Sequence, residues 1–177
     1  MKNEFGELVP GIDFGVFNER TVRAAAGLLF LVGFSGWWIA ALTGNFMPLR
    51  AFGVAFMIDM IIRLFGNAKY SPSMFVGGLI VRPQRPEWVD AEPKKIAWYL
   101  GHGMVGVSCF TMGWFALTGP IPLILCGVCI SFLFLEAAFG ICVGCELARR
   151  FSKQAPEALP GGCLQLHPAE ELVGAKA

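Results

Sequence analysis

Four apolar stretches restrict the folds open to this sequence. They cover residues 21–43, 51–66, 96–118 and 121–148. A helix needs about 20 apolar residues to cross the hydrocarbon core of a bilayer, and three of the stretches reach that length. The second stretch is shorter and contains two charged residues, Asp59 and Arg63. The pattern predicts an all-α integral membrane protein with four transmembrane helices.

The composition supports a membrane protein and argues against other classes. Hydrophobic residues make up 55% and charged residues 15% of the 177 residues, and the mean hydropathy is +0.60. A soluble domain has about 25% charged residues, and disordered chains lack the 16 Phe and 5 Trp found here. A formal net charge of +1 offers no surface that would neutralise phosphates, so we expect no nucleic-acid partner.

We expect one membrane domain over residues 1–153 and a flexible cytoplasmic tail over residues 154–177, which is rich in Pro, Gly, Ala and Glu. Asn18 is the expected N-cap of the first helix. In the proline-interrupted linker before the third stretch, Ser71 and Pro72 are typical of a helix start. The residues after them predict either a short helix in the membrane interface or an ordinary loop packed on the bundle.

Basic residues are distributed unevenly between the two ends of the expected helices. Twelve of the fourteen lie on one side, Arg50 lies alone on the other, and Arg63 is inside a helix. Cytoplasmic loops of membrane proteins are enriched in Lys and Arg. Both termini and the long linker are therefore expected in the cytoplasm, with the lipid bilayer as the surrounding partner.

Three charged residues fall inside the apolar stretches, where a charge costs at least about 2.5–3.5 kcal/mol. Asp59 and Arg63 are four residues apart and can pair on one helix face. Glu136 falls at a similar depth, so we expect Arg63 to face the interior between Asp59 and Glu136. The cluster predicts either a proton or anion site or a structural network that locks the second helix to the fourth; we favour the structural network.

The six cysteines include two Cys-x-x-Cys pairs in the fourth stretch. Cys126 and Cys129 have apolar neighbours, where a cysteine usually behaves as a small hydrophobe. Cys142 and Cys145 lie at the expected cytoplasmic end and are the candidate catalytic thiol pair. Arg149 follows Cys145 by one turn and favours its thiolate, so Cys145 is the candidate nucleophile and Cys142 the resolving thiol. If the helix ended at the pair, its dipole would oppose thiolate formation.

Two other features have weaker chemical implications. Cys163 and His167 could complete a zinc site with the second cysteine pair, but seventeen residues of the tail separate them from it, so no metal is expected. His102 lies in a glycine-rich part of the third stretch and is a further candidate, since histidine titrates near neutral pH. The alternative for His102 is a hydrogen-bonded interior side chain. No cofactor is expected.

Several segments resemble a bacterial membrane family known as domain of unknown function 4395. The segment FLEAAFGICVGCELARRF carries a Glu followed by a C-x-G-C pair, at Glu136, Cys142 and Cys145. Similar segments are FNERTVRAAAGL, IDMIIRLFGNAKYSPSMF and EPKKIAWYLG, and the resemblance spans residues 17–151. It implies a multi-pass protein of the bacterial inner membrane in which Glu136 acts with the cysteines. It also implies a thioredoxin-like or rhodanese-like cytoplasmic partner.

Three functions are open at this point, and the sequence does not decide whether the protein is an enzyme. The first is thiol–disulfide or persulfide chemistry at Cys142 and Cys145 with a soluble partner. The second is a non-catalytic scaffold or accessory subunit of a larger membrane complex. The third is a small-solute or ion transporter that uses Asp59, Arg63 and Glu136. Because four helices rarely enclose a path, a transporter would be a homo-oligomer.

Overall fold

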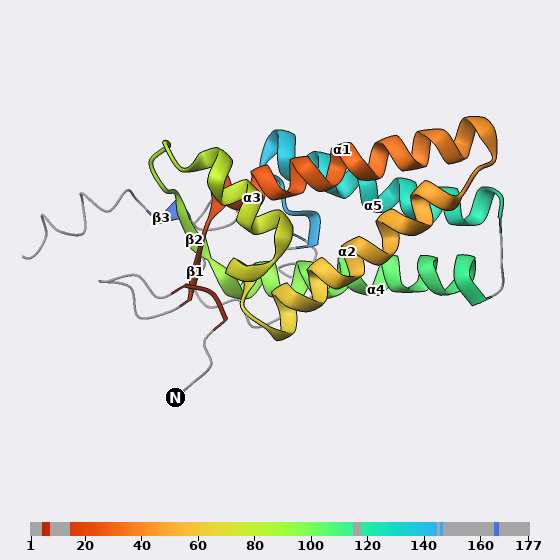
Figure 1. Ribbon diagram of the computed structural model, residues 1–177. Helices are drawn as coiled ribbons and strands as arrows, with labels where there is room; N and C mark the ends of the chain where they lie inside the picture. The colour runs from red at the N-terminus through yellow and green to blue at the C-terminus, as the bar shows by residue number, and fades with distance from the viewer. Residues whose placement is uncertain (1–4, 8–14, 115–117, 145, 147–164, 167–177) are drawn as a thin grey trace, which may run out of the picture.

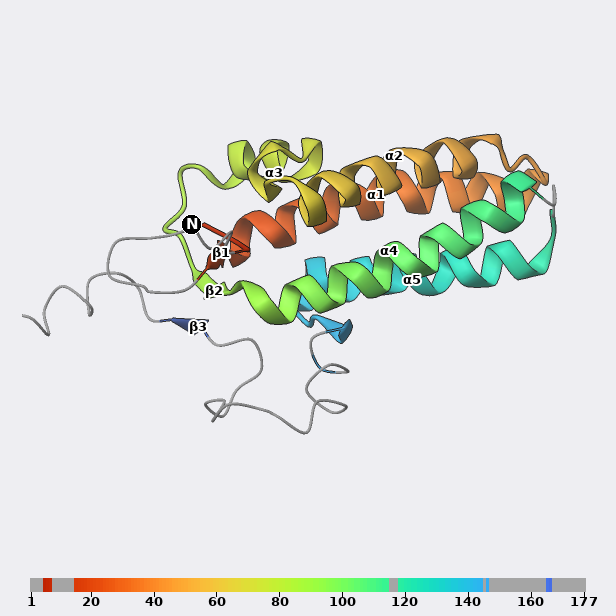
Figure 2. The ribbon, with the colours of Figure 1, turned by 90° about the horizontal axis from the view of Figure 1, so that it is seen from below.

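The computed structural model describes residues 5–7, 15–114, 118–144, 146 and 165–166. In this part of the chain, four long helices run up and down in a bundle (Figure 1): α1 (Glu19–Thr43), α2 (Met47–Phe65), α4 (Ala91–Trp114) and α5 (Pro120–Phe139). Seen from below, α1 and α2 form one layer and α4 and α5 the other (Figure 2). The four long helices form a closed ring, because α1 and α4 each contact both α2 and α5. The predicted all-α class is confirmed.

Short elements gather at one end of the bundle (Figure 1). They are β1 (Val16–Asn18), η1 (Ala68–Tyr70), α3 (Pro72–Val81), β2 (Trp88–Asp90) and β3 (Gln165–Leu166). The strands form an antiparallel sheet in the order β1-β2-β3, with Phe17 opposite Val89 and Val89 opposite Gln165. The sheet was not expected from the sequence, and β3 comes from the predicted tail.

Both expected helix starts outside the apolar stretches are confirmed. The Asn18 side chain caps α1 by accepting a hydrogen bond from the Arg20 N–H at 3.2 Å. Ser71 precedes α3, with Pro72 in its first turn. The linker therefore contains a short helix, and α3 packs against α1. Its location in a membrane interface stays a prediction. The packing is close, since a Cβ on Gly77 of α3 would lie 2.9 Å from the Thr21 carbonyl oxygen.

Two helices begin earlier than predicted. α2 starts at Met47 instead of residue 51, because Pro48 fits the first turn of a helix. α4 starts at Ala91 instead of residue 96 and includes Lys94. Hydropathy marks the apolar part of a helix, whereas backbone hydrogen bonding carries the helix on into polar residues. The predicted end of this helix at residue 118 follows a segment, 115–117, that lies outside the described residues.

The prediction that the fourth helix continues to residue 148 is wrong. α5 ends at Phe139, and Gly140 adopts φ +68°, the left-handed conformation that commonly ends a helix. The backbone becomes helical again at Val143, and the Glu146 N–H donates to the Cys142 carbonyl at 3.1 Å. The carboxyl end of α5 therefore lies three residues before Cys142, and its dipole does not favour a thiolate there.

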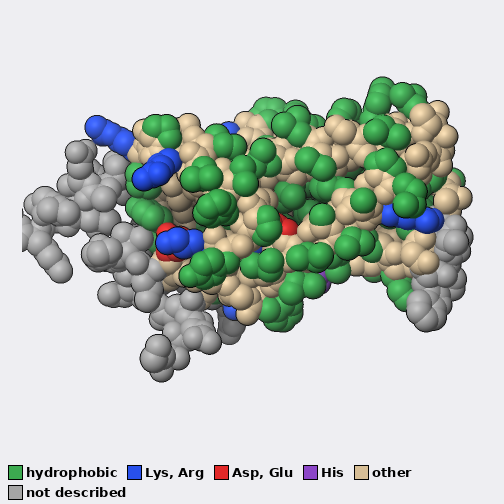
Figure 3. All heavy atoms as spheres, in the orientation of Figure 1, with side chains coloured by type: hydrophobic (Ala, Val, Ile, Leu, Met, Phe, Trp, Pro, Cys, Tyr) green, Lys and Arg blue, Asp and Glu red, His purple; other side chains and the backbone are tan. Residues whose placement is uncertain are grey.

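Figure 3 shows hydrophobic side chains spread along the visible face of the bundle. Large apolar side chains are exposed on all four long helices, among them Leu31, Ile58, Val107 and Ile124. Of the described helices, α1 and α5 are long and apolar enough to cross a membrane. Both observations support a membrane protein.

Candidate functional site

A buried ion pair lies on α2, near the end of the bundle that carries α3. Arg63 Nε donates to Asp59 Oδ2 at 2.9 Å, across one helical turn. The Arg63 residue is only 2% exposed and Asp59 is similarly buried. The guanidinium also lies over the Trp98 ring of α4, 5.0 Å from the ring centroid. The pair therefore faces the interior of the bundle.

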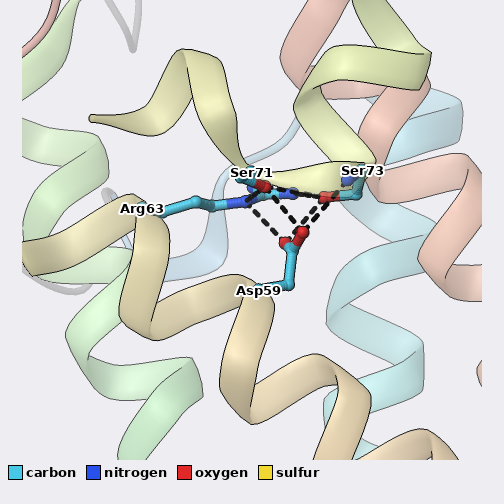
Figure 4. A network of polar contacts seen from close by, with 4 residues as sticks. All are labelled: Asp59, Arg63, Ser71 and Ser73. Carbon is cyan, nitrogen blue, oxygen red and sulfur yellow. Dashed lines mark hydrogen bonds and ion pairs between the residues drawn. The ribbon is translucent and has the colours of Figure 1, made fainter. Parts of the chain in front are cut away.

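Two serines at the start of α3 complete this network (Figure 4). Ser71 Oγ donates to Asp59 Oδ1 and Ser73 Oγ to Asp59 Oδ2, both at 2.6 Å. The Ser73 N–H also donates to Asp59 Oδ1 at 3.0 Å. With Arg63, the Asp59 carboxylate accepts four hydrogen bonds, the saturation expected of a structural buried charge. Ser71 uses its hydroxyl here, and its side chain makes no N-cap hydrogen bond.

A second buried network joins three helices. Lys94 Nζ of α4 lies 2.7 Å from Glu19 Oε2 of α1 and 3.5 Å from Glu136 Oε1 of α5. The Lys94 side chain is fully buried. Lys94 and Glu19 were not expected here, since charged residues at helix ends are usually solvated. Helical periodicity could have indicated the burial of Lys94, because Lys94 shares a helix face with Trp98 and Val105, and both of these are buried.

The two networks face each other across a small cavity. Arg63 and Glu136 both line it and interact electrostatically, as expected from the sequence. The hydrogen bonds of Arg63 go to Asp59 and the two serines, however, and the ion pair of Glu136 goes to Lys94. The predicted lock between the second and fourth helices is thus two networks, one between α2 and the start of α3 and one among α1, α4 and α5.

The cavity contains a cysteine of the candidate pair. Its volume is about 70 Å³, and its lining includes Trp98, Cys129 and Cys142 in addition to Arg63 and Glu136. Such a volume is large enough to admit water. The cavity is therefore lined by two cysteines, a glutamate and an arginine.

Cys142 is 8% exposed and is disulfide-bonded. Its disulfide partner and Cys145 lie outside the described residues. The next described residues hold Cys142 close to α4, because a Cβ on Gly144 would lie 2.6 Å from the Ala97 Cα. The backbone around Cys142 is thus packed against the helix that also carries Lys94 and Trp98.

Of the other cysteines and histidines considered in the sequence, Cys129 lines the cavity, and the rest do not line it or lie outside the described residues. Cys109, Cys126 and Cys129 are free thiols inside the bundle, and Cys126 Sγ lies 3.0 Å from Ser108 Oγ. His102 is partly buried on α4, and its Nδ1 has no hydrogen-bond partner among the described groups. It does not line the cavity. Cys163 and His167, the further ligands of the zinc alternative, lie outside the described residues.

Comparison with known proteins gives one positive result. No curated protein and no solved structure matches the chain. The family model described as "Domain of unknown function (DUF4395)" matches residues 17–153 and so covers most of the chain. This agrees with the resemblance seen in the sequence, and the chain belongs to the DUF4395 family.

Proposed function

We propose that this chain is a four-span bacterial inner-membrane protein that exchanges thiols and disulfides with a soluble cytoplasmic partner at Cys142 and Cys145. One observation carries the proposal. Cys142 is disulfide-bonded at the edge of a cavity that also contains Glu136 and Arg63. Ionisable side chains beside a cysteine are typical of sites at which sulfur reacts.

The four-span arrangement is supported by helix length and by the positions of charges. Helices of 19 to 25 residues are about 28 to 38 Å long, close to or above the hydrocarbon thickness of about 30 Å. The charges that make α2 less apolar, Asp59 and Arg63, point inward and leave lipid-facing positions apolar. Among the described basic residues, seven lie at the α3 end and Arg50 lies at the opposite end, which supports a cytoplasmic α3 end.

Labelling of introduced cysteines tests this orientation. Gln84, after α3, and Asn45, between α1 and α2, are both exposed and lie at opposite ends of the bundle. In spheroplasts, a membrane-impermeant maleimide should label Asn45→Cys at once and Gln84→Cys only after the membrane is permeabilised. The reverse order would contradict the orientation, and equal labelling of both would contradict the four spans.

The exchange is a two-electron transfer with a dithiol protein. A thiolate of the partner attacks one sulfur of the disulfide, the S–S bond breaks, and a mixed disulfide forms while the other sulfur leaves and takes up a proton. The second partner thiol then loses its proton and displaces the first sulfur. The partner ends as a disulfide and the membrane protein as two thiols. In the other direction, the same steps oxidise the membrane protein.

We propose that Cys145 is the second sulfur of this disulfide, and the burial of Cys142 supports different roles for the two sulfurs. Cys142 is nearly buried and makes a poor target for a thiol on another protein. We therefore propose Cys145 as the sulfur that the partner attacks and Cys142 as the leaving and resolving thiol. With the pair reduced, the Cys145 thiolate would instead attack the outer sulfur of a persulfide on a sulfurtransferase-like partner. The S–S bond of the partner breaks, the partner leaves as a thiol, and a persulfide remains on Cys145. The two partner types therefore differ in the product found on that residue.

Differential alkylation in native membranes tests the thiol function. With an oxidised dithiol protein present, Cys142 and Cys145 should be protected from alkylation, and with the reduced protein both should be fully alkylated. Cys109 and Cys126 should respond equally in both states, because they are free thiols inside the bundle. Cys142→Ser should abolish the response of Cys145, whereas the matched variant Cys126→Ser should preserve it. Equal alkylation of Cys142 in both states would contradict the proposal.

An accessory subunit of a larger membrane complex is the second candidate function. Only 11% of the most apolar 18-residue segment of α5 is buried within the bundle, against 28% for the corresponding segment of α1. Beside it lies an apolar groove lined by Trp37, Gly127 and Ser131. Transport has less support, because the hydrogen bonds of Asp59 and Arg63 are made to each other and to two serines.

A further inference from the structure

The buried charges at the α3 end of the bundle do not balance. Among the described residues, this interior contains the carboxylates of Glu19, Asp59 and Glu136 and the cations Arg63 and Lys94. Fully ionised, three negative and two positive charges sum to −1. Asp59 is matched by Arg63 at 2.9 Å. Glu19 and Glu136 share Lys94, and Glu19 is closer, at 2.7 Å against 3.5 Å. Of the two carboxylates that share Lys94, Glu136 is therefore the less closely held.

Glu136 is also the carboxylate that has access to the cysteine. It lines the cavity together with Cys142, whereas neither Glu19 nor Asp59 is among the described lining residues. Its side chain is 15% exposed, and its Oε1 atom lies 3.5 Å from Lys94 Nζ, whereas Glu19 Oε2 lies 2.7 Å from the same ammonium. The Glu136 carboxyl group is therefore held less closely than that of Glu19 and can take up a proton beside the cavity.

We propose that Glu136 delivers the proton that Cys142 needs when its disulfide is reduced, and takes it back when the disulfide reforms. The inference rests on the proposed thiol function. When the partner thiolate breaks the S–S bond, Cys142 leaves with the electron pair of that bond, and the proton from Glu136 converts it to a thiol. The next proton released by the partner dithiol restores the acid form of Glu136.

The surroundings of Glu136 fit both of its protonation states. Lys94 from α4, Glu19 from α1 and Arg63 from α2 interact with it electrostatically. Arg23 of α1 donates to the carbonyls of Ala137 and Ala138 at the same helix end. Ionised Glu136 is held by Lys94. Protonated Glu136 leaves Lys94 to Glu19, and the buried charge then sums to zero.

The test measures how fast dithiothreitol reduces the Cys142 disulfide in the purified full chain, over a range of pH, by quenching with an alkylating reagent. Glu136→Gln should slow reduction by about 100-fold, the lower end of a general-acid contribution, and flatten the pH profile. Glu136→Asp keeps a carboxyl group and should recover most of the rate. The matched control is Glu87→Gln, which removes an exposed carboxylate paired with Arg20 and should leave rate and profile unchanged.

The outcomes separate this inference from the proposed function. If the wild-type Cys142 disulfide cannot be reduced and reformed, the proposed function fails. If the wild type cycles and Glu136→Gln cycles at the same rate with the same profile, the role of Glu136 is wrong. Should Glu136→Gln not fold, the Asp variant decides: a pH profile displaced to lower pH supports the role, since Asp is the stronger acid, and an unchanged profile overturns it.

Discussion

Replacing Arg63 by leucine should lower the free energy of unfolding by about 3–5 kcal/mol, the usual cost of breaking a buried ion pair. The loss arises because the variant leaves the Asp59 carboxylate buried without its cation. Asp59 would keep its two serine partners but lose the guanidinium at 2.9 Å, and an uncompensated carboxylate would stay buried in the bundle. Leucine fills less of the space over the Trp98 ring, which adds to the loss.

Thermal and denaturant unfolding of the protein in detergent micelles measures this effect. The comparison variant is Glu87→Ala, which breaks the Arg20–Glu87 pair, where the side chains are 37% and 38% exposed. Such a surface pair should contribute about 0–1 kcal/mol. The double variant Asp59→Leu/Arg63→Leu should be more stable than Arg63→Leu alone, because no buried charge is left unpaired. Equal losses for Arg63→Leu and Glu87→Ala would contradict the structural role of the network.

The ion pair in this network could be predicted from the sequence, whereas its two serine partners could not. Asp59 and Arg63 are four residues apart on one helix, so their pairing follows from helix geometry alone. Ser71 and Ser73 are twelve and fourteen residues from Asp59 and meet it only because the chain turns back through η1. That turn is a property of the tertiary fold, and a single sequence does not specify it.

The break after α5 had a local signal that hydropathy concealed. Residues 121–148 are apolar almost throughout, so a hydropathy profile reads them as one helix. Gly140 is the residue type that ends helices, and the structure uses it in that way. Glycine is also common inside membrane helices, so the residue type alone does not distinguish the two uses. The position of Cys142 beside the cavity depends on this break.

The buried position of Lys94 was not predicted from the sequence, because the predicted helix begins only at residue 96. Lys94 and Lys95 are adjacent, and both were expected in the solvated linker. A helix that begins at Ala91 gives the two side chains different directions, since adjacent residues differ by about 100° around the axis. Lys94 faces the bundle, whereas the Nζ atom of Lys95 lies 5.2 Å from the ring centroid of Phe5. Where the helix begins thus decides which lysine is structural.

Substitutions of the two adjacent lysines can therefore be compared directly: Lys94 is the test position and Lys95 is its control. Lys94→Met should destabilise the protein by about 3–5 kcal/mol, because Glu19 and Glu136 would both stay buried without their ammonium. Lys95→Met keeps the hydrophobic stem and should cost about 0.5–1 kcal/mol, the value of one cation–π contact at an exposed site. Unfolding in detergent at neutral pH measures both, and equal losses would contradict the assignment.

The pH dependence of the same variant identifies the cause of the loss. In Lys94→Met, each carboxylate that takes up a proton in the folded protein removes an unpaired buried charge, so the free energy of unfolding should rise as the pH falls from 8 to about 5. Adding Glu136→Gln removes one of those charges permanently and should recover part of the stability at pH 8. A Lys94→Met variant whose stability is the same at both pH values would mean that lost packing, not lost charge, explains the effect.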